Sequence, residues 1–200
     1  MKHRATALSA ILPLLLASCI GIDADVRIGT DGSVDATIEY TVSIAVDELG
    51  KLGANASYLP LPVGRDDLDL AARRAGGELR SWSRKDGTES FAVSASLRFP
   101  DAAAFAAFLD PAGSLASFEE AGGKSTLSIR LSGGTPPADK DLAEFIRVAF
   151  TDYSIAIRVA APRNPSAADG FALSGRNASF SMKAADLYAS PDPVSLTLSW

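Results

Sequence analysis

Alternation of apolar and polar residues around two Asp-Gly pairs most constrains how this 200-residue chain can fold. Apolar side chains occupy every second position over residues 22–28 and again over 34–44, on either side of Asp31-Gly32. A second arrangement of this kind covers residues 78–99 and turns at Asp86-Gly87. A period of two is typical of a strand with one buried face, and an Asp-Gly pair readily adopts the positive φ angles of a tight turn. The sequence therefore predicts two long β-hairpins.

Helices are expected between and after these hairpins. Apolar residues at helical spacing, bounded by acidic residues, glycines or prolines, predict helices over 47–53, 66–75 and 101–109, and one that starts between 135 and 141. Further strands are expected over 124–131, 153–160, 171–173, 178–183 and 194–199. Hairpins predominate and no parallel βαβ unit is required. The predicted fold class is therefore α+β, an antiparallel, hairpin-rich β-sheet with helices packed on one face.

The first 19 residues have the features of an export signal. A basic start, Met1–Arg4, precedes an apolar stretch that is too short to span a bilayer comfortably and then small residues. The four residues Leu16-Ala17-Ser18-Cys19 resemble the lipobox of bacterial lipoproteins. That resemblance implies cleavage before Cys19 and acylation of its thiol. The alternative is an ordinary signal peptide that happens to contain a cysteine and is cut elsewhere.

This signal predicts the domain organisation and the location of the chain. We expect residues 1–18 to be a lipoprotein signal peptide, 19–24 a lipidated N-terminus with a short tether, and 25–200 a single α+β extracytoplasmic domain. Two or three acyl chains give stable attachment to a membrane, and no other stretch approaches the roughly 20 apolar residues of a spanning helix. We therefore expect lipid anchoring in the bacterial cell envelope with the domain outside the cytoplasm. The residue after Cys19 is Ile20, which leaves the inner and the outer membrane both open.

Composition excludes several classes of function once the signal is removed. The only histidine, His3, leaves with the signal, so catalytic sets that contain histidine and ordinary His/Cys zinc sites are excluded. The single cysteine excludes an internal disulfide. Loss of Lys2 and Arg4 leaves 17 basic against 24 acidic residues, a formal charge of −7, which argues against a nucleic-acid partner. No cofactor is expected.

Three places in the chain are similar to LppM-type bacterial lipoproteins. A hairpin at Asp31-Gly32 follows the lipobox cysteine, a strand runs into Phe99-Pro100-Asp101 and a helix with Phe105, and a strand over 155–162 leads to the turns at Asp169-Gly170 and Asn177. The resemblance implies an α+β extracytoplasmic lipoprotein domain that offers a surface for a ligand or a partner. That family has no settled activity and no agreed catalytic residues, so it assigns no role to any position here.

The segment from 105 to 118 is the strongest candidate for a binding site. It is expected to form a helix, a break and a second helix, rich in large apolar side chains. Such an element could line or cover a cavity for an apolar ligand, or contact an envelope protein, and it could equally be the helical layer that closes a sheet. We therefore predict a non-enzymatic lipoprotein that binds an apolar ligand or a partner protein at the membrane surface. The candidate binding residues are Phe105, Phe108, Leu109, Leu115 and Phe118.

Carboxylates are the remaining acid and base groups, and they support an alternative function. Asp66, Asp67 and Asp69 gather at a predicted helix start, and Glu119-Glu120 precede a Gly-Gly pair. A carboxylate-dependent hydrolase of envelope glycans would need two such groups facing each other across a substrate, one with a raised pKa. Acidic residues at a helix start are more simply explained by capping and by the helix dipole. Asp23, Asp25 and Asp31 do not have the spacing of a calcium loop, so no metal site is predicted.

Overall fold

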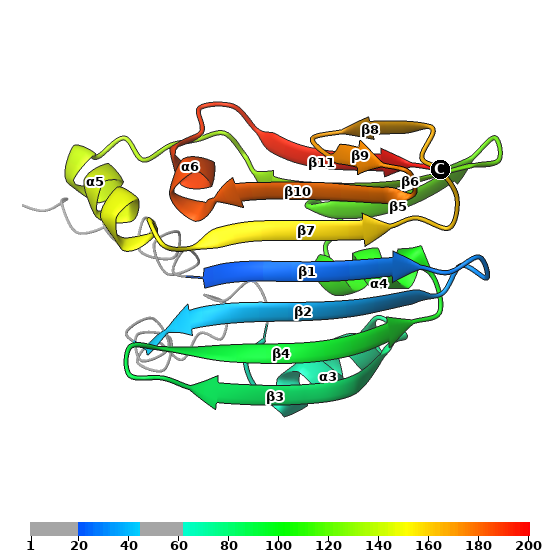
Figure 1. Cartoon of the computed structure of the whole chain (residues 1–200), viewed down its shortest axis with the longest axis horizontal. Helices are drawn as coiled ribbons and strands as arrows, with labels where there is room; N and C mark the ends of the chain where they lie inside the picture. The colour runs from blue at the N-terminus through cyan, green and yellow to red at the C-terminus, as the bar shows by residue number, and fades with distance from the viewer. Residues whose placement is uncertain (1–19, 45–61) are drawn as a thin grey trace, which may run out of the picture.

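The computed structural model describes residues 20–44 and 62–200. The predicted signal peptide, Cys19 and the helix expected over 47–53 lie outside these ranges. The elements, labelled as in Figure 1, are β1 Ile20–Ile28, β2 Val34–Ser43, α3 Arg65–Arg74, β3 Glu78–Asp86, β4 Ser90–Phe99, α4 Ala102–Leu109, β5 Ala116–Ala121, β6 Lys124–Ser132, α5 Lys140–Ala149, β7 Ser154–Ala160, β8 Ala167–Asp169, β9 Ala172–Ser174, β10 Asn177–Lys183, α6 Ala184–Ala189 and β11 Val194–Ser199.

The described strands form two sheets. The larger has seven strands in the order β3-β4-β2-β1-β7-β10-β9, and the smaller has four in the order β5-β6-β11-β8. Both predicted hairpins are present, β1–β2 and β3–β4, and Gly32 has the positive φ of 85° that its turn requires. The predicted α+β class is confirmed.

One pairing in the large sheet is parallel. Strand β7 lies beside β1 with Ile22 opposite Ile155 and Arg27 opposite Ala160, so the sheet is mixed. The strands β2, β3, β4, β5 and β6 all lie between these two in the sequence. Alternation within a strand shows which face is buried but not which distant strand lies beside it, so this pairing had no signature in the sequence.

The core lies behind the large sheet. Inward-facing residues of β1, β2, β4 and β7 form one apolar cluster with side chains of α3, α4 and the small sheet. Helices α3 and α4 lie behind the large sheet, whereas α5 and α6 lie at the end of the sheet where β1 begins (Figure 1). The covering layer is therefore part helix and part sheet. Helix α4 begins as predicted, because the Asp101 carboxylate accepts a hydrogen bond of 2.7 Å from the backbone N–H of Ala104.

Two local expectations differ from the structure, and two elements had not been expected. The second helix expected before Phe118 is wrong, because residues 116–121 form β5 and turn into β6 at Gly122-Gly123. These glycines have φ angles of 60° and 76°, the conformation of a two-residue hairpin turn. Residues 20–24, expected as a tether, belong to β1. Helix α6 and the short strand β8 were not predicted at all.

Candidate functional site

An apolar cavity of about 240 Å³ lies between the large sheet and its covering layer. Its lining comes from both sheets and from α4 and α6. Among the described residues that border it, Arg130 alone is charged. The lining residues are Ile22, Ala24, Val26, Ile38, Phe105, Leu109, Leu115, Ala116, Leu127, Ile129, Arg130, Leu131, Ile155, Ile157, Val159, Leu187 and Tyr188.

Small side chains in the large sheet and the small sheet leave this space open. Ala24 sits on the inner face of β1 between two larger neighbours, with Ile38 opposite it on β2 and Ile157 on β7. Ala116, at the start of β5, lines the same cavity and is 5% exposed. Protein interiors are normally packed as densely as organic crystals, so a cavity of this volume among apolar side chains is a departure that needs an explanation.

The structure brings together three of the five apolar residues predicted as a binding site. Phe105, Leu109 and Leu115 line the cavity. Phe108 does not line it, and its ring packs on Phe99 with centroids 5.1 Å apart; the Phe105 ring also contacts Phe99, at 5.6 Å. Phe118 also lies elsewhere, stacked on Trp200 at 6.0 Å. Both belong to the ordinary core, as the alternative interpretation of this segment expected.

Most of the lining was not predicted. Ile22, Ala24, Ile155 and Ile157 come from β1 and β7, and the sequence indicated only that their side chains face inward. The cavity depends on the parallel pairing of these two strands and on the small sheet that faces them. A signal for the small sheet was present in Gly122-Gly123, which could have been interpreted as a hairpin turn.

A hydrogen-bonded loop forms one side of the cavity rim. The Asp110 carboxylate accepts hydrogen bonds from the backbone N–H groups of Leu115 and Ala112 and from the Ser114 hydroxyl. These bonds, the one from Leu115 first, hold the pKa of Asp110 below its usual range despite its burial. Arg130 closes the loop from the other side, donating to the carbonyl oxygen of Ser114 at 2.9 Å. Leu115 is thereby held at the rim with half of its surface exposed.

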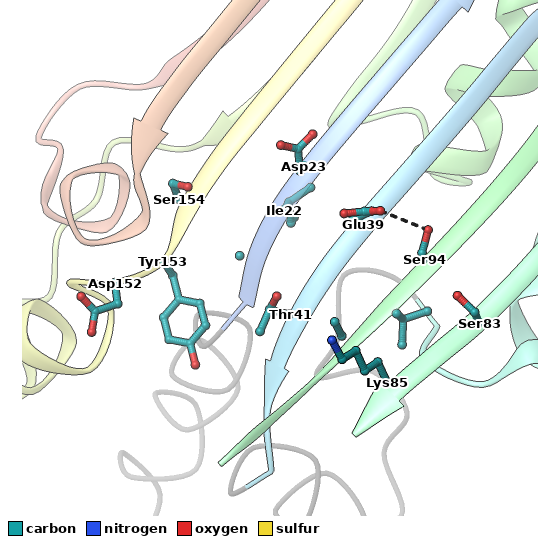
Figure 2. A pocket seen from close by; sticks show the side chains of 13 residues that line it. Ile22, Asp23, Glu39, Thr41, Ser83, Lys85, Ser94, Asp152, Tyr153 and Ser154 are labelled. Atoms are coloured by element: carbon teal, nitrogen blue, oxygen red, sulfur yellow. Dashed lines mark hydrogen bonds between the residues drawn. The ribbon is translucent and has the colours of Figure 1, made fainter. Parts of the chain in front are cut away.

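The outer face of the large sheet carries a second, polar feature. Figure 2 shows a surface groove of about 490 Å³ whose lining includes Asp23, Glu39, Lys85 and Asp152. Asp23 and Glu39 lie directly opposite each other on β1 and β2, and the Ser94 hydroxyl donates to Glu39 at 3.4 Å. The structure thus pairs two carboxylates that the sequence had not connected.

Arg158 neutralises part of this acidic surface. Its guanidinium bonds to the carboxylates of Asp23 and Asp25, and two nitrogens reach the two oxygens of Asp25 at 2.6 and 2.9 Å. The Arg158 hydrogen bond lowers the pKa of Asp25. All three side chains are about half exposed, as expected for the polar side of a strand. The lowered pKa favours the charged form of Asp25, whereas a general acid must carry a proton.

The other predicted acidic clusters are structural or solvated. Asp66 and Asp67 lie in the first turn of α3, and Asp69 forms an ion pair of 2.9 Å with Arg73. Glu119 and Glu120 lie on the exposed part of β5. Within residues 20–44 and 62–200, no three histidine, cysteine, aspartate or glutamate side chains gather as a metal site would require.

No helix in the part of the chain that the structure describes is both long and apolar enough to cross a membrane. No protein-family model and no curated protein matches the chain.

The fold is that of an α+β domain with a mixed seven-stranded sheet covered by helices and a smaller antiparallel sheet. A solved structure with a similar fold is the folded domain of the Mycobacterium tuberculosis protein LppM, determined by NMR. The alignment has a TM-score of 0.51 and covers 92% of this chain and 90% of that chain, at 15% sequence identity. The resemblance to LppM-type lipoproteins is thus confirmed at the level of the fold, and at this identity no residue role is transferred.

Proposed function

We propose that this chain is a lipid-anchored envelope protein that binds an apolar ligand in the cavity between its sheets and catalyses no reaction. The cavity is the observation that carries the proposal. Its volume of about 240 Å³ exceeds the roughly 150 Å³ of an engineered apolar cavity that stays dry and binds benzene.

The energetic cost of an unfilled cavity supports a ligand. Enclosed cavities left by large-to-small substitutions cost about 24 cal/mol per Å³, so about 6 kcal/mol is the upper limit for 240 Å³, and the cost is lower because this cavity is open at its rim. The whole stability of a domain is about 5–15 kcal/mol. A bound hydrocarbon group would offset much of the cost of the cavity, because each buried methylene contributes about 0.8 kcal/mol.

The size of the cavity indicates one hydrocarbon chain. If six carbons of benzene occupy about 150 Å³, a cavity of about 240 Å³ accommodates eight to ten carbons. Pockets for drug-sized ligands span roughly 300–1,000 Å³, so the cavity suits part of a single chain better than a bulky ring system.

The exposed surface gives less support to a protein partner. Among the side chains that the structure describes, the large apolar ones with the greatest exposure are Leu70, Leu115, Val148 and Leu173, none of them aromatic. Hot spots of protein interfaces are enriched in tryptophan, tyrosine and arginine. The hydrolase alternative has one favourable feature, Asp23 opposite Glu39, but Arg158 engages Asp23 and the groove is on an exposed face.

A series of straight-chain 1-alkanols tests the ligand proposal. The Cys19→Ser chain is suitable because it carries no acyl group and needs no competing detergent. Binding measured by calorimetry should tighten about fourfold per methylene, the equivalent of about 0.8 kcal/mol, and level off at eight to ten carbons. Absence of saturable binding, or affinity that rises without a break at longer chains, contradicts the proposal.

Two alanine substitutions locate the site. Ala24→Phe places a ring in the cavity and should weaken octanol binding at least tenfold. Ala92→Phe is the matched control, because Ala92 lies on the exposed outer face of the same sheet. Equal binding by both variants would place the alkanol elsewhere.

The anchor is tested separately. Cys19→Ser should release the chain from membranes and abolish metabolic labelling with palmitate, because the thiol is the acyl acceptor in lipoproteins with this motif. Unchanged partition into the membrane fraction contradicts lipid anchoring.

A further inference from the structure

The cavity opens towards one end of the large sheet. Along β1, the inward residues Ile22 and Ala24 are partly exposed, whereas Val26 and Ile28 are 5% and 4% exposed. Along β6, Leu127 is 1% exposed and Leu131, near the strand's end, is partly exposed. Burial therefore decreases along β1 and β6 towards the start of β1, the end where α5 and α6 lie (Figure 1), whereas Ile155, opposite Ile22 on β7, is only 7% exposed.

The expected lipid anchor is at this same end. Cys19 is covalently joined to Ile20, the first residue of β1, so no linker separates the two. At about 3.3 Å per residue, only about 10 Å of backbone separates Cys19 from Ile22 at the cavity rim. An acylated Cys19 would hold the rim within that distance of the bilayer surface.

The rim has the chemistry of a surface that meets lipid. Leu115 is half exposed, and Ile22, Leu131 and Tyr188 are partly exposed, with the Tyr188 ring packed on Phe150. Tyrosine and tryptophan are enriched where hydrocarbon meets water, because one end of each side chain is apolar and the other polar.

We infer that this rim docks on the bilayer that holds the anchor, and that the ligand is a hydrocarbon chain of a bilayer lipid that enters the cavity directly. This inference rests on the proposed function and names the source of its ligand. A hydrocarbon chain that enters directly from the bilayer is not exposed to water. A chain that had to cross water would be about fourfold less populated there for each methylene exposed. The rim residues are Ile22, Leu115, Leu131 and Tyr188.

Photolabelling of the lipidated full chain tests the inference. The chain is incorporated into phosphatidylcholine vesicles that include a phosphatidylcholine with a diazirine at the end of one acyl chain, irradiated, digested and analysed by mass spectrometry. Adducts should concentrate on peptides that contain the rim and cavity residues. Labelling spread evenly over exposed apolar residues, such as Leu173 on β9, overturns the inference.

Two leucines provide a matched pair of variants. Leu115 and Leu173 are 50% and 48% exposed, so substitution of either by glutamine should leave the fold intact. Leu115→Gln should lower cavity labelling about fivefold to tenfold, the effect expected from removing one apolar side chain from a lipid contact. Leu173→Gln should leave it unchanged. Equal labelling in the two variants would contradict docking of the rim on the bilayer.

Insertions after Cys19 test the geometry. Three EAAAK repeats form a semi-rigid helix of about 22 Å and should lower cavity labelling at least fivefold while the chain stays in the membrane fraction. A Gly/Ser insertion of the same length can fold back and should lower it less. Undiminished labelling with the helical spacer overturns the inference. Failure of the Cys19→Ser chain to bind alkanols is a different result, and it would overturn the proposed function itself.

Discussion

Filling the cavity from β1 should make the protein more stable. Ala24 and Ala95 lie in the same row across the large sheet, on either side of Ile38, and both face inward. Ala24 lines the cavity, whereas Ala95 is 1% exposed and lies outside the cavity lining. The substitutions Ala24→Leu and Ala95→Leu therefore add the same three carbons to two neighbouring sites that differ in free space.

The expected gain can be calculated in two ways. Three added carbons at about 0.8 kcal/mol each give about 2.4 kcal/mol, less about 0.5–1 kcal/mol of lost side-chain entropy. The same carbons fill about 75 Å³, roughly a third of the cavity, and at about 24 cal/mol per Å³ this recovers about 1.8 kcal/mol. We expect Ala24→Leu to raise the free energy of unfolding by about 1.5 kcal/mol in the absence of ligand. Ala95→Leu should lower it by about 1–3 kcal/mol, because a filled site must shift to admit a larger side chain.

Urea unfolding followed by far-ultraviolet circular dichroism measures both variants in the Cys19→Ser background. The urea concentration at the midpoint of unfolding should rise for Ala24→Leu and fall for Ala95→Leu. The slope of the unfolding free energy against urea concentration should be unchanged in both. Ala24→Leu should also weaken octanol binding. If Ala24→Leu destabilises the protein as much as Ala95→Leu does, the space beside Ala24 is ordinary packed core, and both the cavity and the function proposed from it are wrong.

Three further substitutions test the fold around the site. Asp110→Asn should lower the melting temperature at pH 7 by weakening the rim loop. Because the pKa of Asp110 is lowered in the folded protein, its carboxylate stabilises the fold above the unfolded pKa of about 3.9. The melting temperatures of wild type and variant should therefore converge in thermal scans as the pH falls through the native pKa. Arg158→Gln should cost about 0.5–1 kcal/mol at low salt and less at high salt in urea titrations, because its pairs with Asp23 and Asp25 are exposed and screened. Gly77→Ala should cost about 1–3 kcal/mol by the same titration, since its new Cβ would lie 2.3 Å from the Phe99 ring, and an unchanged midpoint would refute that contact.

Local patterns in the sequence predicted the individual elements well. Both hairpins, the helices α3, α4 and α5 and the strands β6, β7, β10 and β11 lie where periodicity and turn residues indicated. These signals succeed because hydrogen bonding, capping and burial of one face act over a few residues. The error at residues 116–121 came because this short segment has no clear period, and its strand character is set by pairing with β6.

The sequence predicted only part of the candidate site. Phe105, Leu109 and Leu115 were identified as apolar residues on one segment, and they do line the cavity. Phe108 and Phe118 have the same chemistry but pack against Phe99 and Trp200. Which phenylalanine borders the cavity depends on the elements opposite, and those are distant in the sequence; Phe105 borders it and also contacts the Phe99 ring.

The sequence by itself determined the α+β class, the two long hairpins, the absence of histidine after Cys19 and the motif that predicts an anchor. Only the tertiary structure decided that β7 lies parallel to β1, that a second sheet covers them, and that a cavity remains beneath Ala24. The physical reason is the separation along the chain over which each effect acts. Strands, turns and caps follow from neighbouring residues, whereas a cavity is the space left when small side chains from distant segments meet, and no single segment specifies that meeting.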